Sequence, residues 1–383
     1  MIRLTRPSIE DDDLDAVRAT LASGHLVQGP RVAAFEQAIA EQVGVAHAVA
    51  VTNCTAALQM ALLALGVGPG DLVVVGAYSW PTTANVVELC GAQPVFADVD
   101  SDTFNLRPDA LADTLARLFQ SPQVGRRVKA IIPVHTFGQI ADMPALLAIA
   151  DRYGVPVVED AACALGAASG GRQAGAWGTM GCFSFHPRKA ITTGEGGAIV
   201  TNDERHARYL RALRNHGQDF EAGTPDQFVM PGFNNRMTEF QAALGVTQMG
   251  KLARVVEARR TLAQRYDILL DPMLARAGAR APDERHVFQS YVVLLPRESA
   301  SERAALIADL RARGVEAQIG TWHMPLVTYY RTRYGHQVGD FPVCDDVAAR
   351  ALTLPLYEGM TLEEQQAVAD ALAATGIVSA SAV

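Results

Sequence analysis

Short apolar segments alternate with helical patterns between about residues 45 and 160, and this alternation limits the chain to few folds. Strands are predicted where residues of the buried type run together, and helices where apolar residues recur on one helix face. Strand, helix and strand at this spacing build a mainly parallel sheet that helices cover on both faces. We therefore predict an α/β fold. The first strand is expected from residue 47 onward, and further strands at 72–80, 93–100, 128–135 and 155–160. Helices are expected at 55–66, 82–91, 107–119 and 144–154.

The rest of the chain predicts a second, smaller unit. Two more strands are expected at 182–189 and 196–203, then a helix at 203–215, a loop at 221–235 and a long amphipathic stretch from Met237 into the 260s. Beyond about residue 270, the pattern gives strands at 290–295 and 315–320, a helix near 302–313 and two C-terminal helices. We expect a large domain over 1–250, which includes the N-terminal segment, and a small α+β domain over 251–383.

Charge and cysteine usage exclude several classes of protein. The formal net charge is −8, and no cluster of Lys and Arg suits nucleic acid or an anionic membrane surface. The N-terminus lacks the apolar stretch of a signal peptide, and no apolar run reaches the roughly 20 residues of a bilayer span. The five cysteines form no CxxC pair, so neither a zinc site nor a disulfide framework is indicated. We expect a cytoplasmic location and no metal.

Two charged residues follow predicted strands, where a parallel sheet places its working residues. Asp160 ends one strand, and its carboxylate could pair with the protonated ring nitrogen of pyridoxal phosphate (PLP); the alternative is an Asp that caps a turn or the next helix. Lys189 ends the apolar segment FSFHPRK, where lysine is unusual unless it has a partner. Its amine could hold PLP as a Schiff base, and the alternative is a lysine that reaches the surface.

Other residues suit the phosphate and the ring of the same cofactor. The turn from Asn53 to Ala57 leads into a helix, whose free N–H groups could bind phosphate together with the hydroxyl of Thr55. The alternative is a plain helix cap. Ser184 could add a second hydroxyl, and Trp80 could stack on the ring or lie in a core or interface. A dinucleotide site is excluded because no GxGxxG joins a strand to a helix.

These residues also carry a resemblance to a known family. The chain is similar to the sugar aminotransferases of the DegT/DnrJ/EryC1/StrS family, which are fold-type I PLP enzymes. The resemblance covers nearly the whole chain, and SFHPRK followed by TTGEGG is its most specific part. It implies a mainly parallel, seven-stranded sheet between helices. The similar segments are 24–41, 55–71, 91–100, 158–167, 183–203, 232–252 and 341–357.

The resemblance also implies a role for each site residue. Lys189 would carry the cofactor and move protons, and Asp160 would pair with the pyridinium nitrogen. Asn234 matches a residue that reaches the phosphate in the neighbouring subunit, which implies a homodimer with its active site at the interface. The remaining matches are Trp80 on the ring, Thr55, the backbone of Ala56 and Ser184 at the phosphate, and Cys163 near the ring oxygen, where the family usually has Gln or His. Cys54 stands where the family usually has glycine.

The expected reaction moves an amino group from L-glutamate, through pyridoxamine phosphate, to the keto group of a nucleotide-linked deoxysugar. A lysine at position 189 favours transamination, because related dehydratases have histidine there. The alternatives are an aminotransferase for a free cyclitol ketone or an aminoshikimate-type precursor, and a PLP lyase. A PLP-binding regulator would need a DNA-binding module, and the chain has no basic arm.

Overall fold

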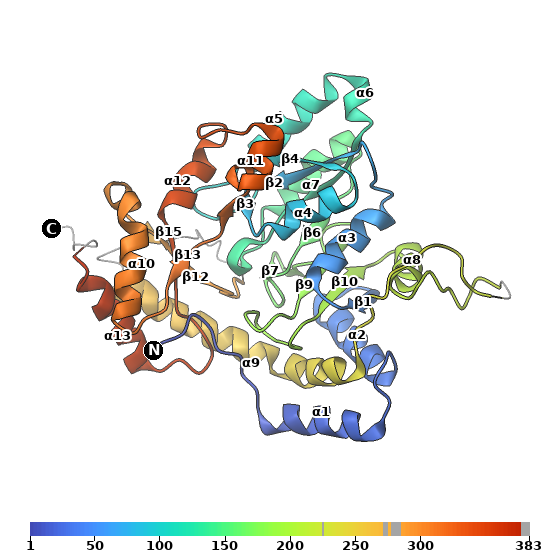
Figure 1. Cartoon of the computed structure of the whole chain (residues 1–383), viewed down its shortest axis with the longest axis horizontal. Helices are drawn as coiled ribbons and strands as arrows, with labels where there is room; N and C mark the ends of the chain where they lie inside the picture. Colours follow the sequence, from blue (N-terminus) through green and yellow to red (C-terminus); the bar gives the residue numbers. More distant parts are fainter. Residues whose placement is uncertain (224–225, 271–274, 277–284, 377–383) are drawn as a thin grey trace.

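A seven-stranded sheet forms the centre of the protein (Figure 1). The computed structural model describes residues 1–383 except 224–225, 271–274, 277–284 and 377–383. A four-stranded part and a three-stranded part join through parallel bridges from Ile131 to Val157 and from Val134 to Asp160. The strands, in spatial order, are β1 (His47–Val51), β10 (Gly197–Thr201), β9 (Met180–Ser184), β6 (Val158–Asp160), β5 (Val128–Ile132), β2 (Leu72–Gly76) and β4 (Gln93–Ala97).

The strand directions confirm a mainly parallel sheet. Strand β2 is parallel to β4 and β5, and β6 is parallel to β9. Within this sheet, as far as the structure describes it, only β10 runs against its neighbours β1 and β9. The carboxyl ends of β2, β5 and β6 therefore lie at one edge of the sheet, which is where ligands bind in open α/β folds.

Helices cover both faces of this sheet, as the side-chain alternation along the strands requires. Val49 and Val51 pack in one apolar cluster with α3, α4 and α8, while Ala48 and Ala50 pack in another with α2, α5, α7 and α9. The α/β prediction is therefore confirmed. The helices of this part are α1 (Asp11–Ser23), α2 (Pro30–Val43), α3 (Cys54–Ala64), α4 (Thr82–Leu89), α5 (Pro108–Phe119), α6 (Pro122–Gly125), α7 (Met143–Tyr153), α8 (Glu204–Arg214) and α9 (Glu239–Leu270).

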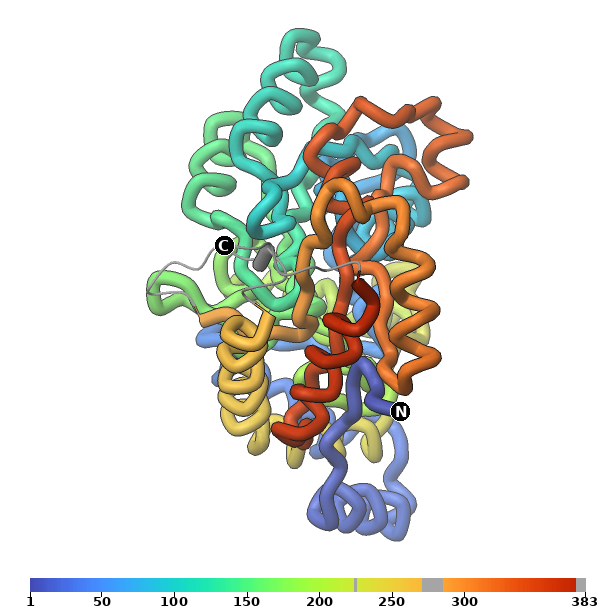
Figure 2. Tube along the Cα trace, turned by 90° about the vertical axis from the view of Figure 1, so that its left-hand side faces the viewer, coloured from blue at the N-terminus to red at the C-terminus, as the bar shows by residue number. Residues whose placement is uncertain are grey.

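A second, antiparallel sheet follows beyond α9, in the order β11-β12-β15-β13. Its own core includes Tyr266 and Leu270 at the end of α9, with Leu306 from α10 and Leu372 from α13. Figure 2 shows α13, in red, beside α9, in gold, with α10, in orange, on the far side of α13. The predicted boundary at 250/251 falls inside α9, which runs without a break between the two sheets. The elements are β11 (Ala275–Arg276), β12 (Tyr291–Leu294), α10 (Arg303–Ala312), β13 (Gln318–Ile319), β15 (Ala351–Leu354) and α13 (Leu362–Ala373).

Several local predictions need correction. The strand expected at 182–189 ends at Ser184, and the chain then turns, since the Lys189 N–H donates back to the His186 carbonyl. Two C-terminal helices were expected, but α11 (Thr328–Tyr334) precedes α12 (Pro342–Arg350) and α13. A short ribbon of β3 and β14 and the hairpin of β7 and β8 were not predicted. Residues 224–225 of the predicted loop lie outside the described residues. The ribbon strands are β3 (Tyr78–Ser79), β14 (Trp322–His323), β7 (Ala168–Ser169) and β8 (Arg172–Gln173), and the 3₁₀ turns are Thr136–Gly138, Arg297–Glu302 and Met324–Leu326.

Candidate active site

Asp160 is a buried carboxylate at the carboxyl end of β6, with only 5% of its surface exposed. Its Oδ2 accepts a hydrogen bond of 2.8 Å from the Thr83 hydroxyl, and its Oδ1 accepts one of 3.2 Å from the Ala162 N–H. Burial raises the pKa of Asp160, because the charged form loses water, while Thr83 and the nearby charge of Lys189 act against this rise. A cationic group would therefore be held strongly at this carboxylate.

The neighbouring acid, Glu159, points to other partners. Its carboxylate accepts hydrogen bonds from the backbone N–H groups of Gly175, Trp177 and Gly178 at 2.6–2.8 Å. It also lies 2.8 Å from Nε2 of His135, which is fully buried. Successive residues of a strand face opposite ways, so Glu159 fastens the loop that precedes β9 while Asp160 faces the site.

Lys189 lies in a turn after β9, not at the end of a strand as predicted. Its backbone N–H donates to the His186 carbonyl at 2.8 Å, and its Nζ lies 3.2 Å from Sγ of Cys163. Burial acts to lower the pKa of Lys189, but Cys163, Cys54 and Asp160 favour the ammonium, and together they leave the pKa raised. The amine must therefore lose a proton before it can attack a carbonyl carbon.

The predicted phosphate turn does contain a helix start. Cys54 is the first residue of α3, so cysteine in place of the family's glycine needs no left-handed conformation. Asn53 caps this helix, and its side chain accepts from the Ala56 N–H at 2.9 Å. Asn53 is therefore a helix cap, as the alternative interpretation of this turn predicted, and the Ala56 N–H already has a partner. Thr55 is partly exposed at the same helix end.

The other predicted site residues lie at the surface or at a strand end. Ser184 ends β9, and its hydroxyl accepts a long hydrogen bond of 3.5 Å from the His186 N–H. Trp80 follows β3 and is 62% exposed, which rules out the core alternative. Asn234 is exposed and pairs through its backbone with Asn215. The structure therefore brings Asp160, Lys189 and Cys163 together, while Asn234 faces outward from this chain.

Thr83 is a site residue that the sequence analysis missed. It lies in the first turn of α4, is 1% exposed, and also lies 3.1 Å from the Ser79 hydroxyl. The only signal in the sequence is a hydroxyl three residues after Trp80, the last residue of the strand predicted at 72–80. Its partner Asp160 is 77 residues away along the chain, so no local pattern connects the two.

These side chains fit PLP. The buried carboxylate of Asp160 suits a protonated ring nitrogen, the amine of Lys189 suits the aldehyde carbon, and the start of α3 suits a phosphate. Among the described residues, no group of three or more His, Cys, Asp and Glu side chains could hold a metal ion. No helix in the described part of the chain is long and apolar enough to cross a membrane.

Comparisons with known proteins agree with this geometry. The model of the DegT/DnrJ/EryC1/StrS aminotransferase family matches residues 7–373, which confirms the resemblance. An aminotransferase of this family from Brucella abortus is 33% identical, with a TM-score of 0.87 and 96% of each chain covered. PseC of Helicobacter pylori, an aminotransferase involved in pseudoaminic acid biosynthesis, is 26% identical, with a TM-score of 0.90 and 98% of each chain covered. The putative sugar aminotransferase Spr1654 of Streptococcus pneumoniae, in its PLP form, is 25% identical, with a TM-score of 0.90 and coverage of 98% and 99%.

Proposed function

Because this chain belongs to the DegT/DnrJ/EryC1/StrS aminotransferase family, we propose that it moves an amino group from L-glutamate to the keto group of a nucleotide-linked deoxysugar. The chain is an aminotransferase, and the proposal concerns its two substrates. The observation that carries it is the buried carboxylate of Asp160, held by Thr83, beside the amine of Lys189. The carboxylate suits a protonated ring nitrogen, and the amine suits an aldehyde carbon.

The cofactor is PLP. A solved relative in its PLP form supports this, and so do the residues of the site. When bound, PLP supplies an aldehyde carbon that takes the amine and a ring that spreads the negative charge formed at Cα. The site residues would then hold the ring and the phosphate, and would move one proton.

Asp160 keeps a proton on the ring nitrogen by pairing with it, and Thr83 keeps the carboxylate in place. Lys189 moves the Cα proton as general base and then as general acid. Trp80 would stack on the ring, and Cys163 would hold the amine of Lys189, which lies 3.2 Å from its Sγ.

Phosphate binding is assigned to the start of α3. Thr55 and Ser184 supply hydroxyl groups, and the positive end of the helix dipole favours the anion. The Ala56 N–H takes part if it is shared with the Asn53 side chain. Asn234 reaches the phosphate of a second copy, so the working form is a homodimer. Its exposure on the single chain supports this role.

The acceptor is proposed to be a keto sugar because the relatives include a putative sugar aminotransferase and an enzyme of pseudoaminic acid biosynthesis. Purified enzyme would be given L-glutamate with either a nucleotide-linked keto-deoxysugar or a free cyclitol ketone. We expect 2-oxoglutarate and one equivalent of amino sugar from the nucleotide-linked acceptor. Product from the cyclitol alone would contradict the proposed acceptor, and ammonia release without an acceptor would indicate a lyase.

A further inference from the structure

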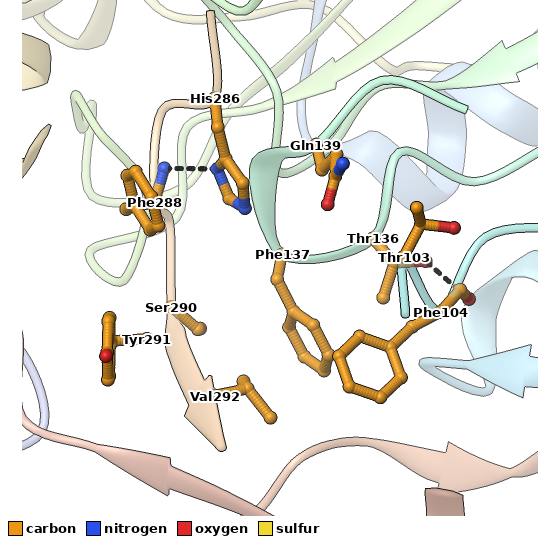
Figure 3. Close-up of a pocket in the computed structure, with 10 residues that line it drawn as sticks. All are labelled: Thr103, Phe104, Thr136, Phe137, Gln139, His286, Phe288, Ser290, Tyr291 and Val292. Atoms are coloured by element: carbon orange, nitrogen blue, oxygen red, sulfur yellow. Dashed lines mark hydrogen bonds between the residues drawn. The ribbon is translucent and has the colours of Figure 1, made fainter. Parts of the chain in front are cut away.

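Residues 286–290 hydrogen-bond to Gly138 and to Arg188, which directly precedes Lys189, before the chain enters β12. Figure 3 shows this segment beside the loop that carries Phe137 and Gln139. Its local shape is fixed at one end, where the Phe288 N–H donates to Nδ1 of His286 at 2.8 Å and the two rings stack with centroids 3.9 Å apart. The segment therefore connects the second sheet directly to the candidate active site.

The contact on the Cys163 side runs through Gly138. The Val287 N–H donates to the Gly138 carbonyl at 3.1 Å. Gly138 has a φ of +96°, and a Cβ there would lie 3.0 Å from both the Cys163 carbonyl oxygen and the Gln289 nitrogen. The backbone of Cys163 and the backbone of Gln289 thus both pack against this glycine, and they leave no space for a side chain there.

The contact on the Lys189 side runs through the side chain of Gln289. Its Nε2 donates to the Arg188 carbonyl at 3.2 Å, one residue before Lys189. The Ser290 hydroxyl donates to Oε1 of Gln289 at 3.2 Å, which turns the amide nitrogen toward that carbonyl. Arg259, only 2% exposed, donates to the Gln289 carbonyl at 3.0 Å and fixes its backbone.

We propose that Gln289 is a positioning residue for Lys189, an inference that rests on the proposed function. Its amide holds the carbonyl that precedes Lys189, so the turn keeps Nζ beside Cys163. A neutral amide suits this place, because it donates a hydrogen bond without adding a charge near the ammonium and Asp160. Since Gln289 is two residues from β12, the same contact ties the position of the lysine to the second sheet.

The test compares Gln289→Met and Gln289→Ala with the unchanged enzyme and with Gln366→Ala. The first variant keeps the length of the side chain and removes the donor. The control removes an exposed amide on α13 that donates to Asp370 at 3.0 Å. Four quantities would be measured: the apparent Kd for PLP from its absorbance, the rate of the half-reaction with L-glutamate, the KM for L-glutamate, and Tm.

Loss of one neutral hydrogen bond should weaken PLP binding by about threefold to tenfold in both Gln289 variants and slow the half-reaction by a similar factor. Their Tm and KM for L-glutamate should match those of the control. Unchanged PLP affinity and rate in both variants would overturn the positioning role, and so would a loss that only follows a lower Tm. If the unchanged enzyme took up no PLP, the proposed function would fail instead.

Discussion

Removal of the Thr83 hydroxyl should slow the first half-reaction by about 10- to 100-fold. The Thr83 hydroxyl donates to Asp160 at 2.8 Å, and the two residues are 1% and 5% exposed. A hydrogen bond to a charged group contributes about 1.5–3 kcal/mol, and each 1.36 kcal/mol corresponds to about a factor of ten. Thr83→Val preserves the shape of the side chain, so it removes only the hydrogen bond to the carboxylate that would pair with the ring nitrogen.

The assay follows the absorbance of PLP-loaded enzyme after rapid mixing with L-glutamate. Thr83→Ser keeps the hydroxyl and should retain most of the rate. Thr82→Val changes the preceding, partly exposed threonine and should leave the rate unaltered. A normal rate in Thr83→Val, or an equal loss in Thr83→Ser, would refute the role assigned to this hydrogen bond.

The loss of stability in Thr83→Val should also depend on pH. The pKa of Asp160 is raised in the folded protein, so its ionisation costs stability as pH rises from the ordinary Asp value of about 3.9 toward the folded pKa. Thr83→Val removes a contact that lowers this pKa, so the folded pKa rises further. Urea unfolding of the cofactor-free protein should show a stability deficit that is larger at neutral pH than in acid. A deficit independent of pH would indicate a packing effect only.

Two further substitutions test the packing around the site and the N-terminal helix by urea unfolding. Gly138→Ala should lower the free energy of unfolding by about 2–4 kcal/mol, because it combines a left-handed φ with overpacking. Gly335→Ala, with a left-handed φ but open space around it, should lower it by only about 1 kcal/mol. Equal losses would contradict the close packing at Gly138. Lys251→Met should cost about 3 kcal/mol, because Nζ of Lys251 lies 2.7 Å from Oδ2 of Asp13, a fully buried carboxylate that would lose its cationic partner and keep only hydrogen bonds from neutral groups. Lys129→Met should cost less than about 1 kcal/mol, and a similar loss in both lysine variants would count against this ion pair.

The main sheet could be predicted from the sequence because its strands are local and their burial is nearly complete. All five residues of β2 are buried, so the run LVVVG is recognisable without knowledge of its partners. Asp160 was predicted as a site residue from its place at the strand end, and in the structure its carboxylate has other partners than that of the preceding Glu159.

Features that depend on distant partners could not be predicted. The apolar pattern around Lys189 suggested a strand, but pairing with β10 stops at Ser184 and the chain turns at Pro187. Thr83 and Gln289 lie in ordinary local sequence, and only the fold brings them to Asp160 and to the Lys189 turn. A pattern along the chain carries no information on such contacts.

The central claim is that Lys189 holds PLP and exchanges it with an amino donor. The most direct measurement is the absorbance spectrum of PLP-loaded protein before and after L-glutamate. We expect a band near the edge of the visible range that moves to shorter wavelength, is lost in Lys189→Ala, and is kept in Lys129→Ala. A protein that stays colourless with added PLP, or a Lys189→Ala variant with the same band and the same shift, would contradict it.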